Sequence, residues 1–398
     1  MSDPAVDSSR EDEAIDRKKP AELPPEIVRA LRPVRAAFRV FVWLLVANVF
    51  LALAIDIALA SRRQRHESHD LRPTLPNYAD HTRANALYAE LTDSWHYRPV
   101  VIEGWRRRAW RGRYVHVDSH GRRYDPAEPT GPARTAHFFG GSTMWGTGVE
   151  DGDTIPAQFA RRRRGWVSRN EGESGWVSRQ GIDRLVNLLN QDEVPDAAIF
   201  YDGVNDAMYL CNGSLSINGH MRELDEQQST SDDSGAMFVV RELFSPEIYL
   251  WRLVRNGRMT KTAATDRCAT GEGADHIART VINNWTIAHD LMAARGRSFL
   301  GVLQPVAYVG HPRLDHLRTL PEDIGAGARN LNDFDRAFYT RVYGRLRARI
   351  AEMNVPWLVD ATDAFDSNDY TYIDYCHVSA NGNAIIAARI DEALGRLE

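Results

Sequence analysis

The sequence predicts an α/β domain in which a parallel sheet is covered by helices on both faces, preceded by one membrane-spanning helix. Two observations support this prediction. Short apolar runs alternate with helical patterns from about residue 134 to the C-terminus, and strands separated by helices form parallel sheets with both faces covered. In addition, one long apolar run from Val40 to Ala60 stands apart from that alternation near the N-terminus.

Residues 1–33 are rich in charged residues, Pro and Ser, and they contain few large apolar side chains. Such a segment cannot bury enough apolar surface to offset the entropy cost of ordering it. We therefore expect a disordered tail.

The apolar run, VFVWLLVANVFLALAIDIALA, has Asp56 as its only charged residue. At ~1.5 Å per residue it spans roughly 30 Å, the thickness of a hydrocarbon core. We expect a transmembrane helix within residues 34–61. Two alternatives stay open: a helix buried in a protein core, and a cleaved signal peptide, because Ala58-Leu59-Ala60 resembles a cleavage site. The length of the run and of the segment before it favours an uncleaved anchor.

The orientation of this helix depends on the positive charges that flank it. The near arginines are equal in number on the two sides, while Lys18 and Lys19 add charge on the N-terminal side. Positively charged flanks tend to stay in the cytosol. We therefore expect a single-pass membrane protein whose large domain is periplasmic or extracellular. The near arginines are Arg29, Arg32, Arg35 and Arg39 before the span and Arg62, Arg63, Arg65 and Arg72 after it.

Residues 62–130 predict a charged lead-in that contains a small β element. Trp95, Trp105 and Trp110 lie among the arginines 106–108. Such a stretch could bind nucleic acid or an anionic sugar, but we expect a solvated strand pair that packs on the main domain. The net charge of −5 also argues against nucleic acid as a partner.

The main domain is predicted to cover residues 131–398. Ser, Thr, Asp, Gly and Asn dominate much of 209–275, which predicts an insertion over the edge of the sheet. Ligands bind at the carboxyl ends of parallel strands. The expected strands are 136–139, 167–170, 197–201, 299–303 and 357–359, and the expected helices are 154–164, 180–190, 276–294, 334–353 and 379–397.

Three cysteines, Cys211, Cys268 and Cys376, have no metal-ligand spacing. No metal and no cofactor is expected. Outside the cytosol one disulfide is possible, and Cys211–Cys268 is the favoured pair because both lie in one irregular region. Whether it forms stays open.

Two segments at predicted strand ends carry reactive groups. Ser142 follows a strand and Gly140-Gly141, so its hydroxyl is expected on a tight turn at the carboxyl edge of the sheet. The alternative is an N-cap serine for the next helix. Near the C-terminus, Asp374 precedes His377 by three residues, a spacing that lets a carboxylate orient an imidazole that acts as general base.

Two further segments carry hydrogen-bond donors. The loop 170–176 contains Gly175, whose N–H no side chain covers, with Gly172 as the weaker candidate for the same role. Asn205 lies directly after the strand at 197–201, and its amide could donate to a developing oxyanion. Each of these segments alone is also typical of an ordinary turn.

Taken in order, the four segments resemble the SGNH (GDSL-like) hydrolase family, over about residues 134–398. The resemblance implies a flavodoxin-like three-layer α/β/α fold and assigns Ser142 as nucleophile, Gly175 and Asn205 to the oxyanion hole, and His377 paired with Asp374. One departure is visible, because the residue before the serine is Gly141, where the family more commonly has Asp. Its absence removes one usual hydrogen-bonding group.

The resemblance implies a serine esterase that forms an acyl-serine and deacylates a carbohydrate or lipid ester. Two alternatives stay open: an O-acyltransferase that modifies an envelope polysaccharide, and a catalytically silent scaffold protein of the envelope. A cysteine nucleophile at Cys376 is also conceivable, but adjacent side chains on a loop usually point apart.

Overall fold

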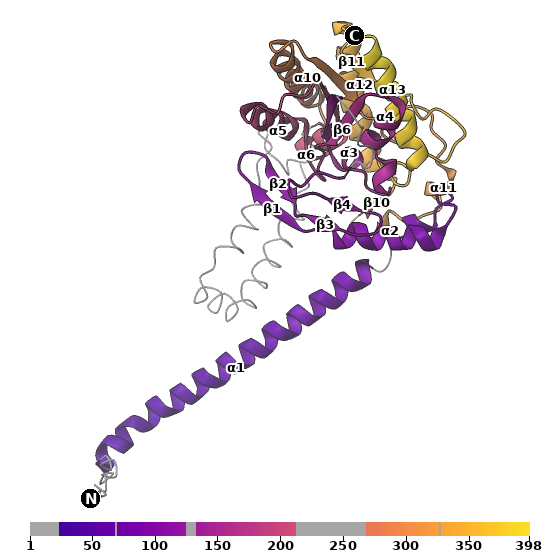
Figure 1. Cartoon of the computed structure of the whole chain (residues 1–398). Helices are drawn as coiled ribbons and strands as arrows, with labels where there is room; N and C mark the ends of the chain where they lie inside the picture. The colour runs from indigo at the N-terminus through magenta and orange to yellow at the C-terminus, as the bar shows by residue number, and fades with distance from the viewer. Residues whose placement is uncertain (1–23, 68–69, 125–132, 212–267, 326–327) are drawn as a thin grey trace, which may run out of the picture.

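The computed structural model describes residues 24–67, 70–124, 133–211, 268–325 and 328–398 (Figure 1). A long helix, α1 (Pro25–Glu67), precedes an α/β domain. It begins at Pro25, so residues 25–33 are helical where the sequence predicted a disordered tail; residues 1–23 lie outside the described residues. Proline suits the first turn of a helix, and Glu26 interacts favourably with the positive end of the helix dipole.

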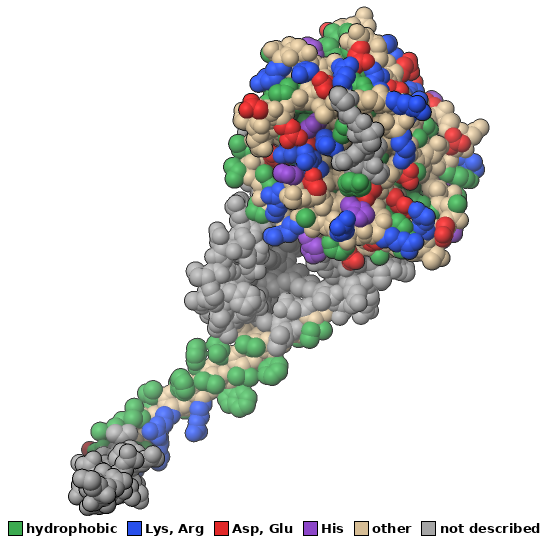
Figure 2. All heavy atoms as spheres, viewed as in Figure 1, with side chains coloured by type: hydrophobic (Ala, Val, Ile, Leu, Met, Phe, Trp, Pro, Cys, Tyr) green, Lys and Arg blue, Asp and Glu red, His purple; other side chains and the backbone are tan. Residues whose placement is uncertain are grey.

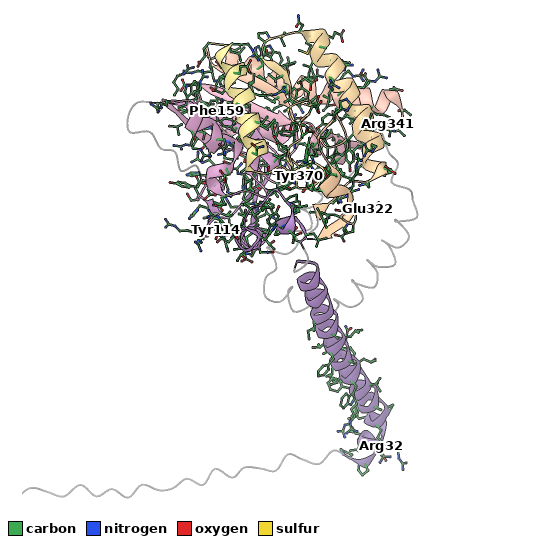
Figure 3. All side chains as sticks on the ribbon, turned by 90° about the vertical axis from the view of Figure 1, so that its right-hand side faces the viewer. Arg32, Tyr114, Phe159, Glu322, Arg341 and Tyr370 are labelled. Carbon is green, nitrogen blue, oxygen red and sulfur yellow. A yellow bond between two sulfur atoms is a disulfide. The ribbon has the colours of Figure 1, made fainter. Side chains whose placement is uncertain are left out.

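Helix α1 exposes apolar side chains. Its segment Pro25–Leu51 reaches a mean hydropathy of 1.8 and buries nothing inside the protein, so it is long and apolar enough to cross a membrane. Figure 2 shows these apolar side chains along the helix, with cationic side chains toward its N-terminal end. Arg32 lies near the end of α1 that is far from the domain (Figure 3). The exposure contradicts the alternative of a helix buried in a core.

The domain is built on a five-stranded sheet in the order β11-β8-β7-β5-β6. All four neighbouring pairs are parallel. When the five strands are numbered in chain order, their order across the sheet is the flavodoxin-like one. Proteins with this strand order bind ligands where the order reverses. The predicted parallel sheet is confirmed. Its strands are β5 (Arg134–Gly140), β6 (Trp166–Asn170), β7 (Ala197–Asp202), β8 (Ser298–Leu303) and β11 (Leu358–Asp360).

Helices cover both faces of this sheet, so the domain has three layers (Figure 1). Successive residues of one strand serve opposite layers: Phe138 packs into one buried apolar cluster and Phe139 into the other. One face carries α5 (Ser178–Asn190), α6 (Val204–Cys211), α10 (Gly271–Ala293) and α12 (Asp333–Met353), and the other carries α4 (Ile155–Arg162) and α13 (Ala380–Gly395). Shorter elements are α3 (Ser142–Trp145), η2 (Asp151–Asp153), α11 (Asp315–Arg318), β9 (Asp323–Gly325) and β10 (Ala328–Arg329).

The lead-in is part of the same core, since Leu87 and Tyr88 lie in one apolar cluster with Phe138. Arg106 and Arg107 are 1% and 0% exposed, so the expectation of a solvated strand pair is wrong for these two residues. The sequence also missed helix α2, which Asp80 caps by accepting the N–H of Arg83. The elements here are η1 (Arg72–Thr74), α2 (His81–Asp93), β1 (Tyr97–Val100), β2 (Gly104–Arg107), β3 (Trp110–Arg111) and β4 (His116–Val117).

Cys211 and Cys268 form a disulfide, with their Cα atoms 5.1 Å apart. The bond joins the end of α6 to the chain just before α10, so the two ends of the predicted insertion are held together. Residues 212–267 of that insertion lie outside the described residues. Cys376 is a free, buried thiol.

Candidate active site

Ser142 is the first residue of α3, directly after β5 and the two glycines. At Gly140 a Cβ atom would come within 2.5 Å of the carbonyl oxygen of Tyr201 on the neighbouring strand, so only glycine allows the sharp turn there. The N-cap of α3 is Gly141, and the Ser142 hydroxyl contacts a histidine instead of the helix backbone. The alternative of an N-cap serine is therefore wrong.

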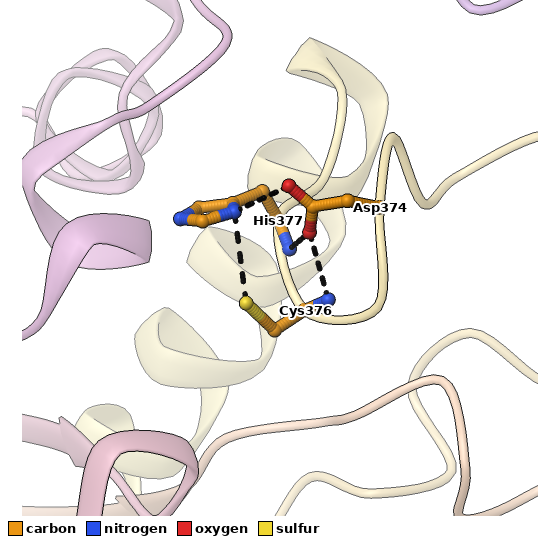
Figure 4. Close-up of side chains that lie close together, drawn as sticks. All are labelled: Asp374, Cys376 and His377. Carbon is orange, nitrogen blue, oxygen red and sulfur yellow. Dashed lines mark hydrogen bonds and ion pairs between the residues drawn. The ribbon is translucent and has the colours of Figure 1, made fainter. Parts of the chain in front are cut away.

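The structure brings Ser142, His377 and Asp374 into one hydrogen-bonded chain. Nε2 of His377 lies 2.7 Å from Oγ of Ser142, and Nδ1 lies 2.7 Å from Oδ2 of Asp374. The other carboxylate oxygen of Asp374 accepts the backbone N–H groups of Cys376 (2.9 Å) and His377 (2.7 Å). Figure 4 shows this carboxylate turned toward the imidazole. Such a chain can move a proton from the hydroxyl to the imidazole.

Asp374 is buried yet held in its ionised form. Burial by itself raises the pKa of Asp374, but the charge and hydrogen bond of His377 and the charge of Arg72 outweigh it, so the pKa lies well below its ordinary value. An ionised carboxylate at this place accepts from Nδ1 of His377. That leaves Nε2 free to accept the proton of Ser142.

Cys376 lies on the other side of the imidazole from Ser142. Its Sγ is 3.6 Å from Nδ1 of His377, whereas the serine contacts Nε2. Burial raises the pKa of the Cys376 thiol, and the Asp374 carboxylate raises it further. A neutral, 4% exposed thiol is a poor nucleophile and a poor metal ligand. The ligand atoms of Asp374, Cys376 and His377 lie within 4.8 Å of one another, but this chemistry suits proton transfer better than metal binding.

Gly175 lies in the loop after β6 and adopts a positive φ of 79°. Among the residues that the structure describes, its N–H donates to no backbone or side-chain acceptor. The N–H of Gly172, by contrast, donates to Oδ1 of Asn170 (3.1 Å), and a Cβ there would come within 2.9 Å of the backbone nitrogen of Trp145. Gly172 is therefore required by the shape of the turn, and its N–H is already bonded. Of the two glycines, Gly175 is the better placed to donate to an oxyanion.

Asn205 lies in the first turn of α6, after β7. Its Nδ2 donates to the carbonyl oxygen of Trp176 (2.8 Å), which fixes the amide. A Cβ at position 141 would collide with this Nδ2. The glycine that departs from the family pattern thus lets the Asn205 amide approach the backbone before Ser142. The candidate donors come from the ends of three adjacent strands, where the strand order reverses.

Residues of the lead-in hold the Gly175 loop, which the sequence did not predict. Trp105 Nε1 donates to the carbonyl oxygen of Ser174 (3.0 Å), and Trp176 Nε1 donates to the carbonyl oxygen of Trp105 (3.1 Å). Arg107 donates to Glu173 and to Oγ of Ser174 (2.8 Å), and its guanidinium lies 3.4 Å from the ring centre of Trp145. Nothing local in the sequence shows which carboxylate an arginine will meet; the alternation of Trp and Arg was the one available signal.

Arg72 was counted only as a charge flanking the membrane span. In the structure its Nη1 donates to Oδ2 of Asp374 (3.2 Å), the oxygen that also faces His377. Arg72 is therefore the one residue of the span's flank that touches the predicted site, among those that the structure describes.

No protein-family model matches the chain, and no curated protein matches it. Solved structures similar to it include a member of the lipolytic G-D-S-L family from Veillonella parvula, at 12% identity and a TM-score of 0.36, over 66% of this chain and 100% of that one. A catalytic mutant of the acetylxylan esterase Axe2 from Geobacillus stearothermophilus is similar at 13% identity and a TM-score of 0.35, over 67% and 95%. The carbohydrate acetylesterase Est24 from Sinorhizobium meliloti is similar at 13% identity and a TM-score of 0.34, over 67% and 100%. At such low identities the activities of these proteins cannot be assigned to this chain. The chemistry therefore has to be argued from the residues of the site.

Proposed function

We propose that the protein is a serine-dependent ester hydrolase that deacylates a carbohydrate or lipid ester through an acyl-Ser142 intermediate. The observation that supports this most is the chain from Ser142 Oγ to His377 Nε2 and from His377 Nδ1 to Asp374 Oδ2, with 2.7 Å at each step. A retained nucleophile, base and orienting carboxylate argue against a catalytically silent scaffold.

In the first half of the reaction, Oγ of Ser142 attacks the ester carbonyl carbon while His377 Nε2 takes the hydroxyl proton. The carbonyl oxygen becomes an oxyanion, to which the N–H groups of Ser142 and Gly175 and the amide of Asn205 would donate. The intermediate collapses, the C–O bond to the alcohol breaks, and His377 gives the proton to the leaving alcohol.

In the second half, a water molecule gives a proton to His377 and attacks the acyl carbon. Collapse of this intermediate releases the carboxylic acid and returns the proton to Ser142. Asp374 stays ionised throughout and stabilises the imidazolium that forms in each half. A sugar hydroxyl in place of water would make the same residues an O-acyltransferase.

We further propose that α1 anchors the protein in a membrane and that the domain lies outside the cytosol. The Cys211–Cys268 disulfide supports this side, because disulfides persist in oxidising compartments and are rare in the cytosol. An acylated lipid or envelope polysaccharide would then lie within reach of Ser142.

Hydrolysis of p-nitrophenyl acetate by the full chain in detergent tests the function, beside Ser142→Ala and the exposed-serine control Ser367→Ala. We expect turnover in the unmodified chain and in the control, and none in Ser142→Ala. Equal background rates in all three folded proteins would contradict the esterase. With an acetyl donor and a polysaccharide acceptor, free acetate as the product indicates hydrolysis and an acetylated acceptor indicates transfer.

A further inference from the structure

The segment that follows α1 packs directly on the loop that carries Asp374 and His377. Asn77 Nδ2 donates to the carbonyl oxygens of Tyr370 (2.5 Å) and Tyr372 (3.3 Å). At the start of the same segment, the N–H of Leu71 donates to the carbonyl oxygen of Ile324 (2.9 Å). Residues 70–78 therefore brace the catalytic loop from outside the sheet.

Arg72 is a buried contact of this brace. It is 4% exposed, and its guanidinium reaches two carboxylates at once. Nε and Nη2 donate to Oδ1 (3.0 Å) and Oδ2 (2.7 Å) of Asp70, while Nη1 donates to Oδ2 of Asp374 (3.2 Å). The ring of Tyr88 covers the guanidinium, with its centre 4.9 Å from the central carbon.

We propose that Arg72 is a positioning residue that fixes the Asp374 carboxylate and, through it, His377, so that the segment following the membrane helix completes the active site. This inference rests on the proposed esterase function. It assigns no contact with substrate to Arg72.

The hydrogen bonds of Asp374 show why its orientation depends on Arg72. Oδ1 is held by two backbone N–H groups, whereas Oδ2 is shared between His377 Nδ1 and Arg72. Arg72 supplies the only side-chain donor to Oδ2 other than the histidine among the described residues. A planar, forked guanidinium can join Asp70 and Asp374 in one plane, which a lysine ammonium cannot do.

The charges of this buried chain are suited to the proposed reaction. With His377 neutral, Asp70, Arg72 and Asp374 together carry a single net negative charge. Protonation of His377 brings the net charge of these four side chains to zero. The buried group therefore favours the imidazolium, and neither carboxylate is left without a cationic partner. Among the described residues, the other titratable groups that interact with these side chains are Tyr88 and Tyr78, whose hydroxyls lie 2.9 Å apart, Tyr375 and Cys376.

The test compares Arg72→Met with the unmodified full chain in detergent. We expect kcat for p-nitrophenyl acetate to fall at least about tenfold with little change in KM, because the substrate does not touch Arg72. The acid limb of the kcat/KM–pH profile should move to higher pH, because Asp374 then faces the imidazole without its counter-charge. Arg72→Lys, which keeps the charge but loses the fork, should restore the profile and only part of kcat.

Arg83→Met is the matched control. Arg83 also clamps one carboxylate through two nitrogens, that of Glu150 at 2.5 and 2.6 Å, but it is exposed and does not contact Asp374. Its kcat and pH profile should equal those of the unmodified chain. If Arg72→Met does not fold, the kcat of Arg72→Lys tests the proposal instead. A kcat of Arg72→Lys equal to that of the unmodified chain would overturn the proposal.

A readout independent of turnover separates this proposal from the esterase function. The Nδ1–H of a histidine bonded to a carboxylate gives a downfield proton resonance, which is assigned here by its loss in His377→Ala. We expect Arg72→Met to lose it. If the unmodified chain is inactive but Arg72→Met loses the resonance, the positioning role stands and the esterase falls. A resonance, kcat and pH profile unchanged in Arg72→Met would overturn the role of Arg72.

Discussion

Arg107 and Glu173 form an ion pair in which neither side chain is exposed to solvent. The backbone N–H of Arg107 donates to Oε2 of Glu173 (2.8 Å), and its Nε donates to Oε1 (3.2 Å). The pair joins β2 of the lead-in to the loop after β6 that carries Gly175. The folding of the lead-in and the position of the loop that carries the candidate oxyanion donor Gly175 therefore depend on each other.

Replacing Arg107 by Met should lower the free energy of unfolding by ~3–5 kcal/mol, because it leaves the Glu173 carboxylate buried without its partner. Urea unfolding followed by tryptophan fluorescence measures the change. The double variant Arg107→Met/Glu173→Leu should recover part of the loss, since no charge is then left buried. Equal losses in the single and double variants would show that the pairing itself does not matter.

Gly141→Ala should lower kcat by about 100-fold or more, because the new Cβ collides with the Asn205 amide and displaces a proposed oxyanion donor. Gly344→Ala is the control, since a Cβ at that position of α12 meets no heavy atom within 4 Å. It should leave kcat unchanged and raise the free energy of unfolding by ~0.5–1 kcal/mol. Esterase rates and urea unfolding of both variants check this, and a fully active Gly141→Ala would argue against Asn205 as a donor.

The stability that Asp374 contributes should depend on pH. Its pKa is lowered in the folded protein, so its contribution is fully present above the unfolded-state pKa of ~3.9 and is lost as the pH falls through the folded value. The difference in unfolding free energy between the unmodified chain and Asp374→Asn should therefore shrink as the pH falls from about 5 to below about 4. Urea unfolding between these pH values measures it. The exposed Asp369→Asn should show no such trend, and neither should Asp374→Asn if its carboxylate were not stabilised by folding.

Loss of the Cys211–Cys268 disulfide should destabilise the domain by ~4 kcal/mol, because the bond closes a loop with a sequence separation of 57 residues. Unfolding of the Cys211→Ser/Cys268→Ser variant measures this cost. Reductant should lower the stability of the unmodified chain by a similar amount and leave the variant unchanged. Insensitivity of the unmodified chain to reductant would indicate that the bond is not formed.

Most of the sheet could be predicted from sequence because its signal is local. A buried parallel strand is a short apolar run, so the predicted strands at 136–139 and 197–201 correspond to β5 and β7 with only their ends shifted. The candidate site could be predicted as far as it follows from strand ends. Ser142 and Asn205 directly follow neighbouring parallel strands, and such strands present their carboxyl ends at one edge.

The surroundings of the site could not be predicted, because the local sequence around a charged side chain does not show which residue it will pair with. Arg106 and Arg107 have the composition of a solvated face. Their burial is made tolerable by partners elsewhere in the sequence, which include the carboxylates of the loop after β6 and the nearby indole rings. The start of α1 at Pro25 also escaped prediction, since apolar content marks the span but not the turns before it.

The sequence alone predicts the parallel sheet, the apolar helix, and the order of Ser142, Gly175, Asn205, Asp374 and His377 along the chain. The contact between Arg72 and Asp374, which are 302 residues apart in the chain, appears only in the folded protein. A strand or an apolar span is encoded by the period and length of neighbouring residues. A buried ion pair joins two residues that are distant in sequence. Whether they come into contact depends on how all the helices and strands between them fold.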